Sequence, residues 1–127
     1  MIENKFKQAA LKGSRQLGAF MALADNSAAE LMANTGFDWL LIDSEHGPND
    51  IASILAQLQA LAAYPVNSVV RLPDHNVANI KRVLDIGAQS LLIPMVDTAE
   101  QAKELAQAVR FPPKGVRGLG GGLTGAT

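Results

Sequence analysis

Residues that could carry acid–base chemistry gather at one point of the sequence, directly after an apolar run. The run Phe37–Ile42 is followed by Asp43, Glu45 and His46, and then by Gly47-Pro48. Histidine is suited to proton transfer because its reference pKa of about 6.5 lies near operating pH. A nearby carboxylate can fix its tautomer and raise its basicity, and Asp43, three residues earlier, is the candidate across a tight turn.

A single arginine, Arg71, stands near the end of a second apolar run, Asn67–Leu72. Its planar fork of donors suits a carboxylate or a phosphate. The carboxyl ends of parallel strands share one rim, so we expect Arg71 to lie beside Asp43 and His46. Together these residues predict a site where an anionic substrate is held and a proton is moved.

The elements that must position these residues alternate between short apolar runs and amphipathic helices. Ser27-Ala28-Ala29-Glu30 and Thr98-Ala99-Glu100-Gln101 have the form of capping boxes, and Asn76 is a candidate helix cap. Predicted strands cover 17–21, 37–42, 67–72 and 90–93. Predicted helices cover 5–12, 27–34, 49–63, 76–87 and 98–109.

This order predicts an α/β fold with right-handed crossovers and a parallel sheet. Roughly 25 residues per strand–helix unit is close to the repeat of a (β/α)8 TIM barrel, which needs about 250 residues. We therefore predict one domain over residues 1–127, formed by the first four βα units of an eight-unit barrel. Residues 111–127 are predicted to be a loop-like tail.

Composition narrows the function classes. The chain has 127 residues, a formal net charge of -1 and no cysteine. Disulfides, thiolate zinc sites and cysteine nucleophiles are excluded, and no general attraction to nucleic acid or to anionic membranes is expected. No apolar segment of signal-peptide or membrane-spanning type is recognisable, so a cytoplasmic location is expected.

Less specific interpretations compete with the functional one. An acid-rich strand end can be a solvated loop, and a lone arginine can form a surface salt bridge. His75 reads as a loop residue near a helix cap, and the glycine run 118–122 as a flexible segment without a phosphate-binding fingerprint. Asp43, Glu45 and His46 alone are a weak signal for a metal site.

Several motifs, taken together, resemble the HpcH/HpaI aldolase family, also called the 2,4-dihydroxyhept-2-ene-1,7-dioic acid aldolase family. The resemblance covers almost the whole chain from about Gly18. Its motifs, which fall in the expected order and spacing, are Phe37–Asn49, Val69–Pro73, Ile80–Ala88, Leu92–Val96 and Phe111–Gly118.

The resemblance implies a TIM barrel and a class II aldolase that uses a divalent metal (Mg, Mn or Co). Such enzymes cleave 4-hydroxy-2-oxo acids to pyruvate, or a related 2-oxo acid, and an aldehyde. By resemblance, His46 is the general base and Asp43 its orienting partner. Arg71 binds the oxo acid and stabilises the enolate oxygen, and Glu45 holds a metal-bound water.

The resemblance also leaves alternatives open. The family's metal-binding Glu and Asp come from later strands and would lie beyond Thr127, so no metal ligand is expected within this chain. A half-barrel leaves two strand edges and an apolar face open, which predicts a homo-oligomer. The chain could instead be a catalytically silent half-barrel that acts only through self-association or a partner half. Citrate-lyase-like relatives, which use acyl-CoA substrates, are a weaker alternative.

Overall fold

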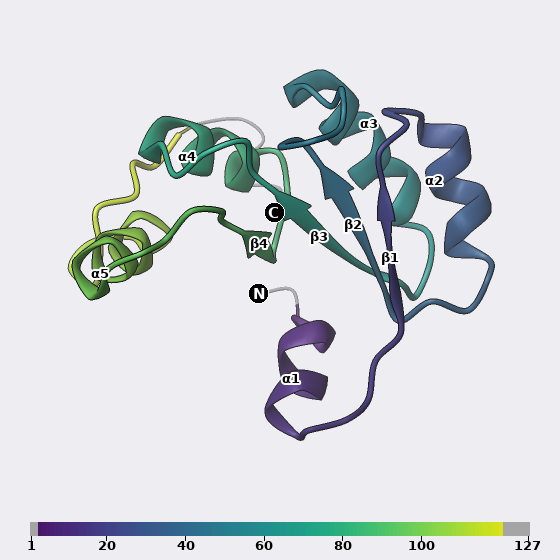
Figure 1. Cartoon of the computed structure of the whole chain (residues 1–127), viewed down its shortest axis with the longest axis horizontal. Helices are drawn as coiled ribbons and strands as arrows, with labels where there is room; N and C mark the ends of the chain where they lie inside the picture. Colours follow the sequence, from purple (N-terminus) through teal and green to yellow (C-terminus); the bar gives the residue numbers. More distant parts are fainter. Residues whose placement is uncertain (1–2, 121–127) are drawn as a thin grey trace.

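A curved four-stranded parallel sheet forms the centre of the computed structural model, which describes residues 3–120 (Figure 1). The strands lie in chain order, so each neighbouring pair is joined by a helical crossover. The strands are β1 (Gly18–Met21), β2 (Trp39–Asp43), β3 (Asn67–Arg71) and β4 (Leu91–Leu92). The helices are α1 (Lys5–Leu11), α2 (Asn26–Ala33), α3 (Ile51–Leu61), α4 (Val77–Asp85) and α5 (Ala99–Ala108).

The core lies between the sheet and the four helices that follow its strands. Alternate strand residues face these helices, among them Leu40, Ile42 and Val70, all fully buried. Helices α2 to α5 add apolar side chains to the same cluster: Ala29, Ala33, Ile54, Leu58, Leu61, Ile80, Val83, Leu84, Leu105 and Ala108. The helices therefore cover one face of the sheet, as in a βα barrel.

Helix α1 has no buried residue and lies apart from the other helices (Figure 1). Phe6 packs edge-on against Trp39, with ring centroids 6.2 Å apart. The backbone N–H of Phe6 donates to Asn67 Oδ1 at 3.2 Å, and Asn4 Nδ2 donates to Ser90 Oγ at 3.0 Å. Because Trp39 and Asn67 begin β2 and β3, α1 lies at the amino ends of the strands.

Two of the predicted helix caps, Asn76 and the Thr98–Gln101 box, are confirmed, and one is wrong. Asp50 and Asn76 cap α3 and α4, and Thr98 with Gln101 forms the predicted capping box of α5. The predicted Ser27–Glu30 box is wrong: Asp25 caps α2 and accepts a hydrogen bond from Ala28 N at 2.7 Å. The helix therefore begins before Ser27, which removes that residue from the capping position.

The described part of the tail, residues 111–120, contains no helix or strand, and the rest lies outside the described residues. Strand β4 is two residues long, shorter than the predicted 90–93. Within residues 3–120, no helix is long and apolar enough to cross a bilayer.

Candidate active site

Strand register brings the predicted site residues together at the carboxyl ends of β2 and β3. Asp43 and Arg71 are direct register partners in the parallel ladder. Side chains in register on neighbouring strands point to the same face of a sheet. That face is the one opposite the helices, since Leu40 and Ile42 alternate with Asp43 and face the core.

Asp43 and Arg71 form a two-point pair. Arg71 Nε donates to Asp43 Oδ1 at 2.9 Å, and Arg71 Nη2 donates to Asp43 Oδ2 at 2.6 Å. Asp43 is only 4% exposed. The hydrogen bond from Arg71 outweighs the effect of burial and lowers the pKa of Asp43 from 3.8 to about 2. Both side chains are therefore ionised at neutral pH.

Glu45 joins Arg71 to His46. Arg71 Nη1 lies 3.1 Å from Glu45 Oε2, and His46 Nε2 lies 3.7 Å from the same oxygen. The imidazole side chain is 72% exposed, so it is open to a substrate at the rim. Glu45 is therefore the carboxylate of this group that faces the imidazole.

The expectation that the Asp43 carboxylate orients the imidazole of His46 differs from the structure. The chain does fold back across a tight turn, but the backbone N–H groups of Glu45 and His46 reach Asp43 Oδ1, at 3.0 and 3.2 Å. Arg71 occupies the rest of the carboxylate. The three-residue separation between Asp43 and His46 brings the backbone N–H of His46 back to the Asp43 carboxylate. The imidazole ring of His46 is left exposed to solvent.

Phe20 is a site residue that no motif in the sequence indicates. The Arg71 guanidinium carbon lies 5.3 Å from the centroid of the Phe20 ring. Phe20 is the register partner of Leu41, two residues before Asp43, so the same face of β1 carries it. An aromatic face beneath the guanidinium stabilises the cation and restrains its plane. Strand alternation was the signal that could have revealed this contact.

Two further residues fix the turn between Asp43 and α3. Asn49 Nδ2 donates to the backbone carbonyl of Asp43 at 2.7 Å. A Cβ added to Gly47 would lie 2.5 Å from that same carbonyl oxygen, so only glycine fits there. The sequence marks Asn49 only as part of a helix start, and no local pattern indicates its contact with Asp43.

The other sequence candidates lie away from this group. His75 is exposed in the loop between β3 and α4. Asp74 beside it accepts hydrogen bonds from Asn76 N and Asn79 Nδ2, which lower the pKa of Asp74. Gly118 to Gly120 are irregular and exposed, and the rest of the glycine run lies outside the described residues.

The described residues do not fit a metal site by themselves. Residues 3–120 contain no group of three or more His, Asp or Glu side chains that could hold an ion. Asp43 directs both carboxylate oxygens at Arg71, and Glu45 directs one at the same guanidinium. Both acids therefore pair with Arg71, and they do not form a set of metal ligands.

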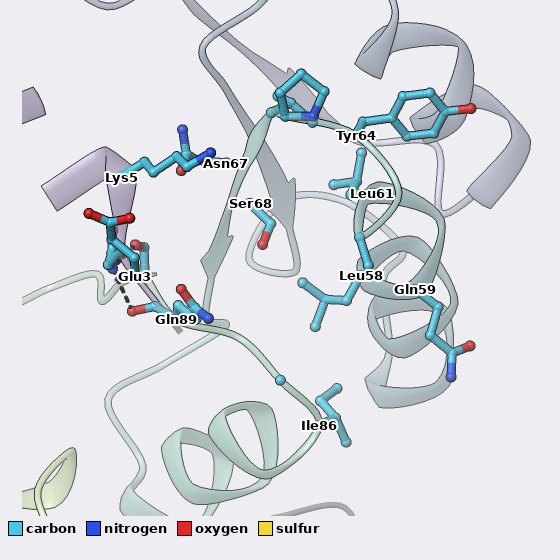
Figure 2. Close-up of a pocket in the computed structure, with 16 residues that line it drawn as sticks. Glu3, Lys5, Leu58, Gln59, Leu61, Tyr64, Asn67, Ser68, Ile86 and Gln89 are labelled. Atoms are coloured by element: carbon cyan, nitrogen blue, oxygen red, sulfur yellow. Dashed lines mark hydrogen bonds between the residues drawn. The ribbon is translucent and has the colours of Figure 1, made fainter. Parts of the chain in front are cut away.

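A cavity of about 440 Å³ opens at the opposite end of the sheet (Figure 2). Leu58 and Leu61 of α3, Ile86 after α4, and Ser68 near the start of β3 line it. Asp43, Glu45, His46 and Arg71 are not among its lining residues. The candidate site is thus an open rim at the carboxyl ends of the strands, and this cavity is separate from it.

The fold and the position of this site define a class of protein. A parallel βα sheet whose charged residues follow the strands at their carboxyl ends is the TIM-barrel arrangement, here represented by four units. The chain belongs to the HpcH/HpaI aldolase/citrate lyase family, whose model matches residues 16–124.

Individual relatives agree with this assignment. The chain is 60% identical over 124 residues to a hydroxypyruvate/pyruvate aldolase of Chromohalobacter salexigens, covering 98% of the chain and 48% of that protein. It is 48% identical over 126 residues to a 4-hydroxy-2-oxo-heptane-1,7-dioate aldolase of Escherichia coli, covering 99% and 48%. The chain therefore spans about half the length of the curated relatives it matches.

A solved structure gives the same result. An HpcH/HpaI aldolase/citrate lyase family protein from Burkholderia cenocepacia superposes with a TM-score of 0.89 at 40% identity. The match covers 94% of this chain and 49% of the solved one. The predicted fold class and family are confirmed.

Proposed function

We propose that this chain carries the proton-transfer and oxo-acid-binding half of an aldolase site. The reaction is cleavage of a 4-hydroxy-2-oxo acid to pyruvate, or a related oxo acid such as hydroxypyruvate, and an aldehyde. The observation that carries the proposal is an arginine fixed by two acids beside an exposed histidine. Two relatives are named hydroxypyruvate/pyruvate aldolase and 4-hydroxy-2-oxo-heptane-1,7-dioate aldolase. These names support oxo acids and hydroxy-oxo acids as the substrate class.

Arg71 is the proposed oxo-acid ligand. Arginine has five N–H donors. Within the described residues, Nε and Nη2 each donate to Asp43, and Nη1 lies 3.1 Å from Glu45 Oε2 as an ion pair. One N–H on each terminal nitrogen therefore remains for a substrate. This pair suits the carboxylate or the developing enolate oxygen of a 2-oxo acid, and the acids and Phe20 hold it in place before substrate arrives.

His46 is the proposed general base. Its imidazole takes the proton of the 4-hydroxyl group, the C3–C4 bond breaks, and the hydroxyl carbon leaves as the aldehyde carbonyl. The bond's electron pair forms the enolate of the oxo acid, which Arg71 stabilises. A proton delivered to C3 then gives the free oxo acid, and Glu45, near His46 Nε2, stabilises the imidazolium between these steps.

Family membership implies a divalent metal, Mg, Mn or Co. Residues 3–120 do not supply its ligand set, so no step above depends on it. The proposed roles of Asp43, Glu45, His46 and Arg71 concern this chain's own side chains, and the metal is included in the assay for its known effect on oxo-acid carbonyls.

The test is pyruvate release from a 4-hydroxy-2-oxo acid, followed with a coupled dehydrogenase in the presence of Mg, Mn or Co. We expect turnover that His46→Ala abolishes. The chain's other histidine provides the matched control, and His75→Ala should leave the rate unchanged. An absence of turnover would favour the silent half-barrel interpretation.

We also propose that copies of the chain associate through the face that carries the site. Phe20 of β1 and Leu92 of β4 are 52% and 43% exposed, and both share the face of Arg71. Both residues lie on strands at the edges of the described sheet, where backbone groups can pair with another chain. Analytical ultracentrifugation should find a dimer or larger species that Phe20→Ser weakens, and a stable monomer would contradict this.

A further inference from the structure

Two buried amide side chains connect helix α3 to the turn that carries His46. Gln57 is 1% exposed and Asn49 is 9% exposed. Gln57 Nε2 donates to Asn49 Oδ1 at 2.6 Å, and Asn49 Nδ2 donates to the Asp43 carbonyl at 2.7 Å. We call this Gln57–Asn49–Asp43 series the amide relay.

The turn after Asp43 is attached to that residue at two points, and the amide relay holds the second. At the start of the turn, the Asp43 carboxylate accepts hydrogen bonds from the backbone N–H groups of Glu45 and His46. At its end, Asn49 returns to the Asp43 carbonyl. Gln57 Nε2 at 2.6 Å and Ser53 Oγ at 3.3 Å both donate to Asn49 Oδ1, with Gln57 the closer donor. These donors fix which way the Asn49 amide faces and leave Nδ2 to point at Asp43.

Packing alone does not explain Gln57. Its neighbours along the buried stripe of α3 are Ile54, Leu58 and Leu61. Gln57 Oε1 is buried without a hydrogen-bond partner among the described residues, which is unfavourable. An apolar side chain of the same size would avoid that cost. The amide contributes its N–H donors to Asn49 and to the Ser53 carbonyl, and the Asn49 contact leads to the site.

We propose that Gln57 and Asn49 are positioning residues that hold His46 in place relative to Arg71. The inference rests on the proposed role of His46 as the base. Arg71 is fixed separately by the pairing of β2 with β3, so loss of the amide relay should move His46 and leave Arg71 in place. Binding of the oxo acid and transfer of the proton should then respond differently.

The experiment compares Gln57→Met, Asn49→Ala and the control Gln59→Met, an exposed glutamine on the same helix. Amide hydrogen exchange by NMR reports the turn directly and needs no turnover. In Gln57→Met and Asn49→Ala, the Glu45 and His46 amides should exchange about tenfold faster, while the Leu41 and Val70 amides stay protected. Gln57→Met should keep or raise the melting temperature. Gln59→Met should match the parent chain.

Three outcomes would overturn the proposal. The first is unchanged exchange at Glu45 and His46 in both relay variants. The second is a uniform loss of protection that includes the sheet, which would make the role purely structural. The third applies if the parent chain turns over a 4-hydroxy-2-oxo acid. We then expect Gln57→Met to lower kcat with KM unchanged. A kcat equal to that of the parent chain would contradict the proposal. Failure of turnover in the parent chain would count against the proposed function and leave the exchange result standing.

Discussion

Asp43 and Arg71, 28 residues apart in the chain, are register partners that also form a two-point side-chain pair. The backbone ladder and the ion pair therefore specify the same alignment of β2 and β3. A slip of one residue would place the two side chains on opposite faces of the sheet. The position of the arginine is thus a property of the sheet, whereas that of His46 depends on the turn.

Asp43→Asn should destabilise the chain by about 2–3 kcal/mol, because it removes the closer of the two carboxylate charges that compensate the mostly buried guanidinium of Arg71. Urea unfolding at pH 7 measures the change. Asp97→Asn, on an exposed loop, is the matched control and should fall within about 0.5 kcal/mol of the parent. Equal stabilities for the two variants would show that the pair contributes little.

The free energy of unfolding should fall as the pH is lowered from about 4 toward 2. The pKa of Asp43 is about 2 in the folded chain against an ordinary value of 3.8, so the unfolded state binds the proton more readily. The contribution, up to about 2 kcal/mol, is complete above about pH 4 and is lost as the pH falls toward 2. Unfolding midpoints measured between pH 2 and 7 test this. Asp43→Asn should flatten the acid limb of the curve.

Arg71→Lys should weaken oxo-acid binding about tenfold even though the positive charge is kept. A lysine ammonium cannot reproduce the fork that binds both Asp43 oxygens and a substrate at once. It also loses the flat contact with Phe20. Titration of pyruvate by NMR or calorimetry measures the affinity, with Arg82→Lys on the exposed side of α4 as control. Parent-like affinity in Arg71→Lys would remove this arginine from the binding site.

His46→Ala should change stability by less than about 0.5 kcal/mol, because the imidazole is mostly exposed. Its effect on turnover should be about 10²- to 10⁴-fold, the usual contribution of a general base. Thermal unfolding and pyruvate release, measured on the same preparation, separate these two effects. A large loss of stability would indicate that the residue supports the turn instead.

Gly47→Ala should destabilise the chain by about 1–3 kcal/mol, because the new methyl group would meet the Asp43 carbonyl oxygen at 2.5 Å. The nearest other atom, Ala22 Cα at 3.3 Å, leaves little room for the turn to shift. Gly118→Ala meets nothing nearer than 3.8 Å and serves as the control. Circular dichroism melts of the two variants should differ accordingly.

Local signals in the sequence predicted the elements well. The Thr98–Gln101 box and the Asn76 cap are short-range patterns, and both are confirmed. Ser27–Glu30 has an equally good pattern, but Asp25 lies two residues earlier and caps the helix first. Glu30 instead accepts a hydrogen bond from the hydroxyl of Tyr64 at 2.8 Å, a partner 34 residues away. Local patterns do not distinguish between such competing caps.

The site was predictable as a group of residues and less so as a set of contacts. The apolar run before Asp43 and the position of Arg71 placed both at one rim. The choice of Arg71 over His46 as the partner of Asp43 depends on strand register, which the chain specifies only when the strands pair. Gln57 was hidden for a similar reason. Its place in the apolar stripe of α3 is consistent with burial, but its partner Asn49 lies eight residues earlier, outside the helix, and no local pattern connects the two.

The contacts of α1 have a consequence for the order of folding. Asn4 reaches Gln89 and Ser90 across 85 and 86 residues, immediately before β4. Contacts so distant in sequence form slowly, because a long loop must close before they can contribute. The helix also meets Trp39 and Asn67, so its docking surface exists only after β2, β3 and the start of β4 have assembled. We therefore expect the first helix of the chain to be the last to dock.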